Sequence, residues 1–167
     1  MNITLDVVVS NPSWPATVTS TSWLQPVVAT TLAQYSWPKA LRNCELSFNF
    51  TDDATIAELN TDFLQQQAAT NVLSFPTQSI SPGNTTDIEV SGDYCHLGDI
   101  VLAHQYICTD ATNLNLNFEH HLIHLIVHSI LHLLGYDHLK DSEAEQMEAK
   151  EIAILKLFSI ENPYQNN

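Results

Sequence analysis

Positive charge is scarce in this sequence. Only five of the 167 residues are Lys or Arg, against 19 Asp and Glu, so the formal net charge at pH 7 is −14. Proteins that hold free nucleic acid by its phosphates do so with many cationic side chains. The shortage of cations therefore argues against a simple electrostatic grip on nucleic acid, and the large net charge favours solubility.

Cysteine is also sparse, with three residues (Cys44, Cys95 and Cys108) and no C-x-x-C pair. An odd number without paired spacing indicates reduced thiols rather than a disulfide framework. No apolar run reaches the roughly 18 residues that a membrane-spanning helix needs. The first residues have no basic stretch and include Asp6, unlike a secretory signal peptide. We therefore expect a cytoplasmic protein with no membrane partner.

The length is that of one domain, and neither repeats nor a linker divides the chain. Segments rich in alternating apolar and β-branched residues predict four strands, at 3–9, 44–50, 70–76 and 97–103. The last of these is apolar enough to lie inside the sheet. Helical periodicity predicts about five helices between and after them. The predicted fold is a single α+β (mixed α/β) domain over residues 1–167, a small four-stranded sheet packed with about five helices.

Two helices and one connection carry more specific expectations. The helix after residue 52 has an apolar stripe of Ile56, Leu59 and Phe63, which we expect in the core. Ser142 and Glu145 form a capping-box pattern that predicts the start of the last helix. Residues 77–96 are polar and aperiodic, which predicts a long loop or a lid.

The stretch "HSILHLLGYDH" (128–138) carries the chemistry. His128 and His132 are four residues apart, so they share one face of a helix. Gly135 ends such a helix, because glycine adopts the left-handed cap conformation cheaply. His138 then follows a short turn. Three histidines in this pattern can hold one zinc ion and leave its fourth position open. The sequence predicts a zinc site at His128, His132 and His138, at the end of a core helix.

These histidines also have other interpretations. A lone histidine on an apolar face is usually a core residue with a hydrogen-bond partner, but several in one core each need such a partner. His124 lies one turn before His128 and is expected to be structural or to support a ligand. Asp137 is most simply a turn residue, although it can also support a ligand. A metalloprotease is disfavoured, because the HExxH motif needs Glu where Ser129 stands.

The same stretch resembles the HGxLHLxGYDH signature of the YbeY family, bacterial endoribonucleases of ribosomal RNA maturation. "TNVLSFP" (70–76) with "LN" (59–60) before it, "LGDIVLA" (97–103) and "DSEAEQMEAKE" (141–151) are similar to family segments in the same order. The resemblance covers about residues 45–164.

This resemblance implies a cleft beside the sheet, with zinc on the three histidines and Thr70, Asn71 and Ser74 as substrate contacts. It implies zinc-dependent cleavage of single-stranded RNA, chiefly in 3′-end processing of small-subunit ribosomal RNA and in ribosome quality control. The expected partner is ribosomal RNA in the small ribosomal subunit, and DNA is not expected.

The sequence departs from the family pattern at three points. Leu64 stands where the family has an arginine that opens a basic stretch, and that arginine would be the natural partner of the scissile phosphate. Ser129 replaces a glycine of the signature, a change between small residues. No basic face is present, since Lys39 and Arg42 are the only cations before residue 140. Lys140, two residues after His138, is the candidate for a compensating phosphate contact.

Two functions from different classes follow. The first is the zinc-dependent endoribonuclease, which the retained set of three histidines favours. The second is a ribosome-associated metal-binding factor with weak or no nuclease activity, which the loss of the basic stretch favours.

Overall fold

The computed structural model describes residues 1–64 and 70–165, apart from the side chain of Leu64. Its sheet has four strands, β1 (Asn2–Val9), β2 (Asn43–Thr51), β3 (Val72–Pro76) and β4 (Tyr94–Ala103). Their order is β1-β2-β4-β3. β1, β2 and β4 are parallel, and β3 pairs antiparallel with β4. The predicted mixed fold is confirmed, with β4 inside the sheet.

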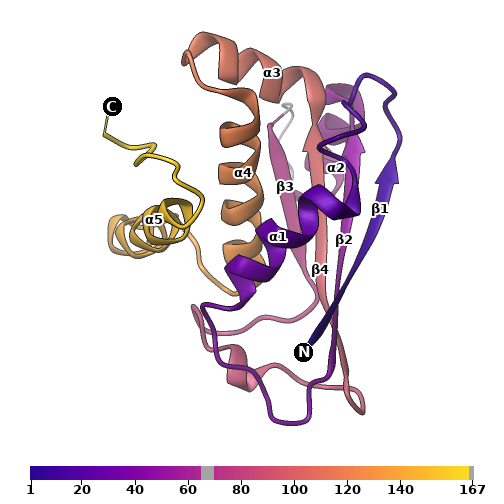
Figure 1. The fold of residues 1–167 in the computed structure, drawn as a ribbon, viewed down its shortest axis with the longest axis vertical. Helices are drawn as coiled ribbons and strands as arrows, with labels where there is room; N and C mark the ends of the chain where they lie inside the picture. Colours follow the sequence, from indigo (N-terminus) through magenta and orange to yellow (C-terminus); the bar gives the residue numbers. More distant parts are fainter. Residues whose placement is uncertain (65–69, 166–167) are drawn as a thin grey trace.

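Five α-helices accompany the sheet in the described part of the chain: α1 (Thr21–Leu32), α2 (Asp53–Leu64), α3 (His104–Asn113), α4 (Phe118–Leu133) and α5 (Asp141–Lys156). Figure 1 shows α1 and α4 over one face of the sheet, with α5 outside α4. None of the described helices is long and apolar enough to cross a membrane.

The alternation of side chains along β4 explains how both faces of the sheet become covered. Ile100 and Leu102 belong to the large core that includes α1 and α4. Val101 and Ala103 join a smaller cluster on the opposite face, with Ile56 of α2. Because β4 is apolar on both sides, it needs a layer on each.

Helix α4 is buried along most of its length, as its nearly continuous apolar sequence predicts. It lies between the sheet and α5 (Figure 1). A helix placed this way fixes the orientation of any polar side chain it carries, because its neighbours leave little room for movement. The histidines of α4 are therefore held on a rigid element.

Two details of the helix predictions were wrong. Phe63 was expected in the core but is 66% exposed, with its ring edge-on to that of Phe75 of β3. Helix α5 begins at Asp141, and its N-cap residue Lys140 makes no side-chain capping hydrogen bond. Ser142 therefore lies inside the first turn, where it cannot be the cap of a capping box.

The segment between β3 and β4 is a long connection, as predicted, with a single 3-10 turn at Thr85–Asp87. Near its start it crosses the end of α4, where Gly83 N donates to the carbonyl of Leu134 at 2.9 Å. The connection therefore forms part of the wall at the end of α4.

Candidate metal centre

The end of α4 places the three predicted ligands. His128 and His132 lie one turn apart, and the helix ends at Leu133. Gly135 then has φ of 85°, a left-handed conformation that glycine adopts without strain. A Cβ at Gly135 would also collide with the carbonyl oxygen of Ile80. Glycine therefore lets the chain reverse here and bring His138 back toward the helix.

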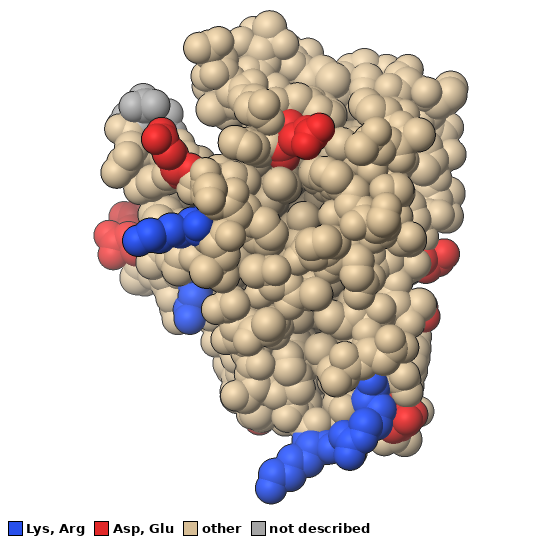
Figure 2. Space-filling view, viewed as in Figure 1, with Lys and Arg blue, Asp and Glu red and all other residues tan. Residues whose placement is uncertain are grey.

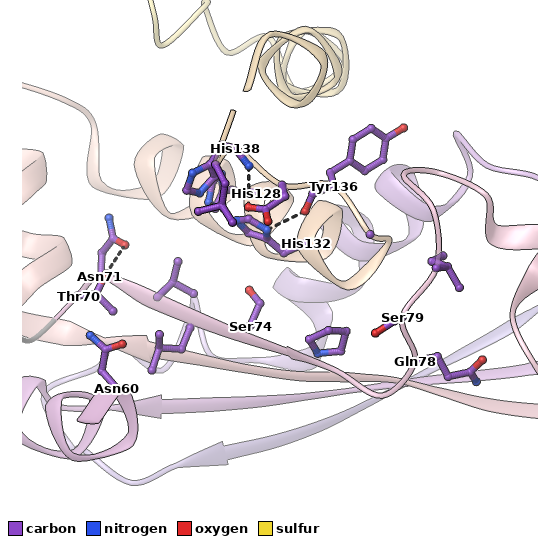
Figure 3. Close-up of a pocket in the computed structure, with 17 residues that line it drawn as sticks. Asn60, Thr70, Asn71, Ser74, Gln78, Ser79, His128, His132, Tyr136 and His138 are labelled. Atoms are coloured by element: carbon purple, nitrogen blue, oxygen red, sulfur yellow. Dashed lines mark hydrogen bonds between the residues drawn. The ribbon is translucent and has the colours of Figure 1, made fainter. Parts of the chain in front are cut away.

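The three histidines converge as the sequence predicted. One ring nitrogen of each lies within 4.8 Å of the others, so the group can hold a metal ion. Nε2 of His128 and Nε2 of His132 are 3.0 Å apart. Figure 3 shows the three rings together between α4 and the turn that follows it, above strand β3. His128 and His132 are half-buried, whereas His138 is exposed.

The outer nitrogens of the two helical histidines have acceptors. Nδ1 of His132 lies 2.9 Å from the carbonyl oxygen of Tyr136. Nδ1 of His128 lies 2.5 Å from Oε1 of Glu151. A carbonyl and an ionised carboxylate only accept hydrogen bonds, so both Nδ1 atoms carry the proton.

The position of these protons decides whether the Nε2 atoms are free to bind a metal. With the proton on Nδ1 and none on Nε2, each ring directs its Nε2 lone pair at the other across 3.0 Å. Two facing lone pairs repel, and a cation between them turns that repulsion into two bonds. Ligating histidines usually donate their other N–H to a carbonyl or carboxylate, as both do here. The donor set therefore fits a metal ion.

Glu151 of α5 is a functional residue that the sequence reasoning missed. It is fully buried, and besides His128 it contacts His124 (Nε2 to Oε2, 3.2 Å) and accepts from the hydroxyl of Tyr164. Burial alone raises the pKa of the carboxyl, but the hydrogen bonds from His124, His128 and Tyr164 outweigh burial and lower the pKa to about 2. The carboxylate therefore stays charged and keeps its bond to His128.

A sequence signal for Glu151 exists. Met147, Ile154 and Leu155 form the buried stripe of α5, and Glu151 lies on that stripe, one turn after Met147. An acidic residue in an apolar stripe is seldom buried without a partner. The contacts of His124 with Glu151 agree with the supporting role expected for that histidine.

His132 is held neutral by its surroundings. Burial lowers its pKa to about 4, with a further contribution from His128, and these effects outweigh the opposing hydrogen bond to Tyr136. A metal ligand must be unprotonated to bind. His132 is therefore unprotonated, as a metal ligand must be, down to mildly acidic pH even before a metal binds.

The histidines open onto a cavity of about 720 Å³. Thr70, Asn71 and Ser74, the expected substrate contacts, line it together with all three histidines. Figure 3 shows Ser74 on β3 directed toward the histidines, with Asn71 further along the wall. Asn60, Gln78 and Ser79 also line the cavity and were not foreseen. The wall opposite the histidines therefore offers neutral donors and acceptors.

Asn71 is tied to a second element. Its Nδ2 lies 3.4 Å from Oδ2 of Asp110 on α3, and its Oδ1 lies 3.5 Å from the hydroxyl of Thr70. These contacts fix the amide at the edge of the sheet. Asp137 also lines the cavity, and its Oδ1 accepts from the backbone N–H of His138 at 2.7 Å, the turn role expected of it.

No Lys or Arg is among the described residues that line the cavity. Lys140 is exposed, and its Nζ lies 2.9 Å from Oε1 of Glu143, so its substrate role stays a prediction. The expectation about Leu64 falls on a side chain outside those described. Ser129 is fully buried and is not among the described residues that line the cavity.

Fold and site together define a class of protein. The chain has a mixed α/β fold with a three-histidine group, suited to a metal, in the wall of a cavity. The family model of endoribonuclease YbeY matches residues 9–159. The chain belongs to the YbeY family.

Curated relatives and a solved structure agree with this assignment. A protein of Sinorhizobium fredii is 42% identical over 87% of this chain and 80% of its own length. One of Rhizobium meliloti is 44% identical over 76% of this chain and 71% of its own. Both are named endoribonuclease YbeY. A Thermotoga maritima protein with a solution structure has a TM-score of 0.55 at 20% identity, covering 92% of this chain and 87% of its own, which supports the fold alone.

Proposed function

We propose that this protein is a zinc-dependent endoribonuclease that cleaves single-stranded RNA. The observation that supports the proposal is the pair of facing Nε2 atoms of His128 and His132, completed by His138, in the wall of a cavity. Membership of the endoribonuclease YbeY family supports RNA as the substrate. Three imidazoles are a common zinc set with one position left open, which supports zinc.

The protein's own residues prepare the site. His128, His132 and His138 would hold the ion, and Glu151 and the carbonyl of Tyr136 fix the tautomers of the first two. The chemistry that a zinc ion would supply there is that of a Lewis acid, which can activate a water and offset charge on a phosphoryl oxygen. The hydroxyls of Thr70 and Ser74 line the opposite wall, where they can donate to phosphate or ribose oxygens.

The shape of the site supports a single-stranded substrate. The cavity lies between β3, the end of α4 and the connection that crosses it, and short polar side chains form part of its wall. A separated strand can enter such a space and present one phosphate to the histidines. A duplex keeps its bases stacked and paired, so its backbone is less free to present one phosphate in this way.

The biological substrate we propose is the 3′-end precursor of small-subunit ribosomal RNA, with a further part in ribosome quality control. The family resemblance supports this choice. The net charge of −14 supports action within a ribosomal particle in the cytoplasm, since contacts with ribosomal proteins of the small subunit tolerate an acidic surface better than contacts with free RNA do.

The test is cleavage of a single-stranded RNA that spans the 3′ end of small-subunit ribosomal RNA. Purified zinc-loaded protein is compared with His132→Ala and with His96→Ala, whose histidine lies on β4 and does not line the metal cavity. We expect cleavage by the wild type and by His96→Ala, and none by His132→Ala. The proposal fails if cleavage persists in His132→Ala, or if a protein that binds one zinc ion does not cleave.

A second candidate function has its own supporting observation. The described lining residues of the cavity include no Lys or Arg, and a nuclease gains from a cation beside the scissile phosphate. A ribosome-associated metal-binding factor needs none. This candidate predicts that the protein binds one zinc ion and co-sediments with small subunits, but does not cleave RNA in the same assay.

A further inference from the structure

Strand β3 is an edge of the sheet, and its outer side borders the metal cavity. The strand order β1-β2-β4-β3 leaves β3 paired on one side. Residues 70–74 line the cavity without a gap. Leu73 is among them, although its side chain belongs to the cluster on the opposite face of the sheet. A cavity that touches successive residues, whichever face their side chains occupy, runs along the backbone of the strand.

The hydrogen bonds between β3 and β4 fix the direction of each backbone group. At one end of β3 the N–H of Ala103 donates to the carbonyl of Asn71 at 2.9 Å, and at the other end the N–H of Thr77 donates to the carbonyl of Leu97 at 3.0 Å. In an antiparallel pair, residues bonded to the neighbouring strand alternate with residues whose N–H and C=O point away from it. Because the register between these two bonds is regular, residues 71, 73, 75 and 77 face β4, and residues 72, 74 and 76 face the free edge.

The free edge therefore offers two N–H donors, those of Val72 and Ser74, because Pro76 has no N–H. In the described part of the chain, neither N–H donates to a backbone carbonyl of a loop or helix. The two donors are two residues apart, about 6.8 Å along the strand. The carbonyls of the same residues point the same way. An occupant of this edge has to supply acceptors for the N–H groups and a donor for the carbonyls.

The charge of the cavity restricts how it can hold a phosphate. No Lys or Arg is among its described lining residues, and Figure 2 shows the Lys and Arg side chains toward the margins of the face in view. The acidic residue among those described in the wall, Asp137, already accepts from the N–H of His138. A phosphate in this cavity therefore depends on neutral donors, and backbone N–H groups aimed at an anion are donors of this kind.

An RNA backbone matches both kinds of group at the edge. Its phosphate oxygens accept hydrogen bonds, and its 2′-hydroxyl can donate to an outward carbonyl. Figure 3 shows Ser74 on the wall below the three histidines, with Asn71 and Thr70 further along. Of the two donors, the N–H of Ser74 is thus the one nearer the metal ligands.

We propose that the free edge of β3 holds the RNA backbone, with the N–H of Ser74 donating to the phosphate beside the histidines and the N–H of Val72 donating to a neighbouring phosphate. The proposal rests on the proposed nuclease function. It gives backbone N–H groups the task for which the sequence led us to expect an arginine. Contacts to phosphate carry no sequence information, so this mode of binding predicts cleavage with little preference among bases.

The first test is a titration of ¹⁵N-labelled, zinc-loaded protein with inorganic phosphate, at an ionic strength kept constant with chloride. We expect a saturable downfield shift of the amide proton of Ser74. Leu73 and Phe75 are the internal controls, because their N–H groups already donate to β4, and they should move less. Equal shifts at residues 73, 74 and 75, or no shift at Ser74, would overturn the proposal. Phosphate is not cleaved, so this result does not depend on nuclease activity.

The second test compares Ser74→Pro with Ser74→Ala in cleavage of single-stranded RNA. Proline removes the N–H without breaking a bond to β4, and Pro76 already occupies an equivalent outward position opposite Gly98. Alanine removes the hydroxyl and keeps the N–H. We expect kcat/KM of Ser74→Pro to be about tenfold or more below that of Ser74→Ala, since one donor to a developing anion is worth about 10²- to 10³-fold. Zinc affinity should be equal in the two variants.

The outcomes separate the two proposals. If the folded variants cleave alike, the N–H of Ser74 does not hold the phosphate. If the wild type does not cleave RNA, or if Ser74→Pro does not fold, the phosphate titration decides the role of the edge by itself. An extended peptide is the alternative occupant of a free strand edge. If a tetra-alanine peptide blocked at both ends shifts the amides of Val72 and Ser74 and phosphate does not, the edge binds peptide and the proposal is wrong.

Discussion

Nδ1 of His128 lies 2.5 Å from Oε1 of Glu151, a carboxylate that is fully buried and 23 residues further along the chain. This contact ties α5 to the metal-site end of α4. Since the same carboxylate also holds His124 and Tyr164, the orientation of one ligand depends on the packing of α5 and of the C-terminal segment. The metal centre is therefore built by more of the chain than its three histidines.

The first prediction concerns Glu151→Gln. The amide keeps the size of the side chain but removes the charge that fixes the Nδ1–H tautomer of His128. We expect zinc affinity to fall about 10- to 100-fold, the usual cost of losing such a supporting partner. Competition with a chromophoric zinc chelator measures the affinity.

Glu145→Gln is the control for this substitution, because Glu145 lies on the exposed side of the same helix. Its zinc affinity should equal that of the wild type. Equal affinities of Glu151→Gln and Glu145→Gln, in folded proteins, would show that Glu151 does not support the site.

The second prediction concerns pH and the metal-free protein. The pKa of His132 is about 4 in the folded state against an ordinary value of 6.5, chiefly because of burial. Between these values the unfolded chain binds a proton and the folded protein does not, so the free energy of unfolding falls as the pH falls from 6.5 to 4. One group contributes a slope of up to about 1.4 kcal/mol per pH unit. Glu151, with a pKa of about 2 against 4.5, continues the loss below pH 4.5.

Urea unfolding of chelator-treated protein at pH 7, 5.5 and 4.5 measures this slope. The comparison is with His132→Asn, which cannot titrate in this range. The variant should lose less stability between pH 7 and 4.5 than the wild type. A slope that is the same in both proteins would assign the acid sensitivity to other groups, among them His121, whose pKa is also lowered by burial.

The third prediction concerns Gly135→Ala. Alanine at a φ of 85° is strained, and its Cβ would also meet the carbonyl of Ile80. We expect a loss of about 2 kcal/mol or more in the free energy of unfolding. Because the backbone must move to relieve the contact, His138 is displaced and zinc affinity falls as well. Thermal unfolding and the chelator competition measure the two effects.

Gly92→Ala separates the two causes. Gly92 has φ of 66°, but a Cβ there meets nothing within 4 Å. It should show the backbone strain, about 1 kcal/mol, with normal zinc affinity. If the two alanine variants lose equal stability and both bind zinc normally, the contact with Ile80 has no role at the site.

Local patterns in the sequence were enough to predict the parts of the molecule that depend on nearby residues. The spacing of His128, His132, Gly135 and His138 predicted the ligand cluster, because helix periodicity and a glycine turn determine it. The alternating segments predicted the strands for the same reason. Phe63 was misplaced because periodicity identifies a face of a helix but not where the neighbouring layer ends.

Contacts between distant segments could not be predicted in this way. The pairing of His128 with Glu151 depends on how α5 packs on α4, and no local rule gives that geometry. The same holds for the metal cavity, which forms only where the connection after β3 meets the end of α4. For Glu151 the chain held a signal, a charged residue in an apolar stripe, but not the identity of its partner.

The fourth prediction concerns Lys140, the nearest cation in sequence to the ligands. Its Nζ pairs with Glu143 at the exposed start of α5, so it must leave that pair to contact a phosphate. If it does, Lys140→Ala lowers kcat/KM for the RNA and weakens the dependence of binding on salt. Lys156→Ala, at the far end of α5, is the control. Unchanged cleavage by Lys140→Ala would show that Lys140 does not contact the phosphate.

The fifth prediction concerns Leu64, at the position where the sequence resemblance led us to expect an arginine. Leu64→Arg adds a cation of the kind that stabilises the charge developing on a phosphate, and removing one such donor from an enzyme costs about 10²- to 10³-fold in rate. We expect Leu64→Arg to raise kcat/KM for single-stranded RNA at least about tenfold, with zinc affinity unchanged. Leu64→Gln, polar but uncharged, is the matched control and should have no such effect. If Leu64→Arg and Leu64→Gln cleave alike, the missing arginine does not limit this protein, and its phosphate must be held by the neutral wall of Thr70, Asn71 and Ser74.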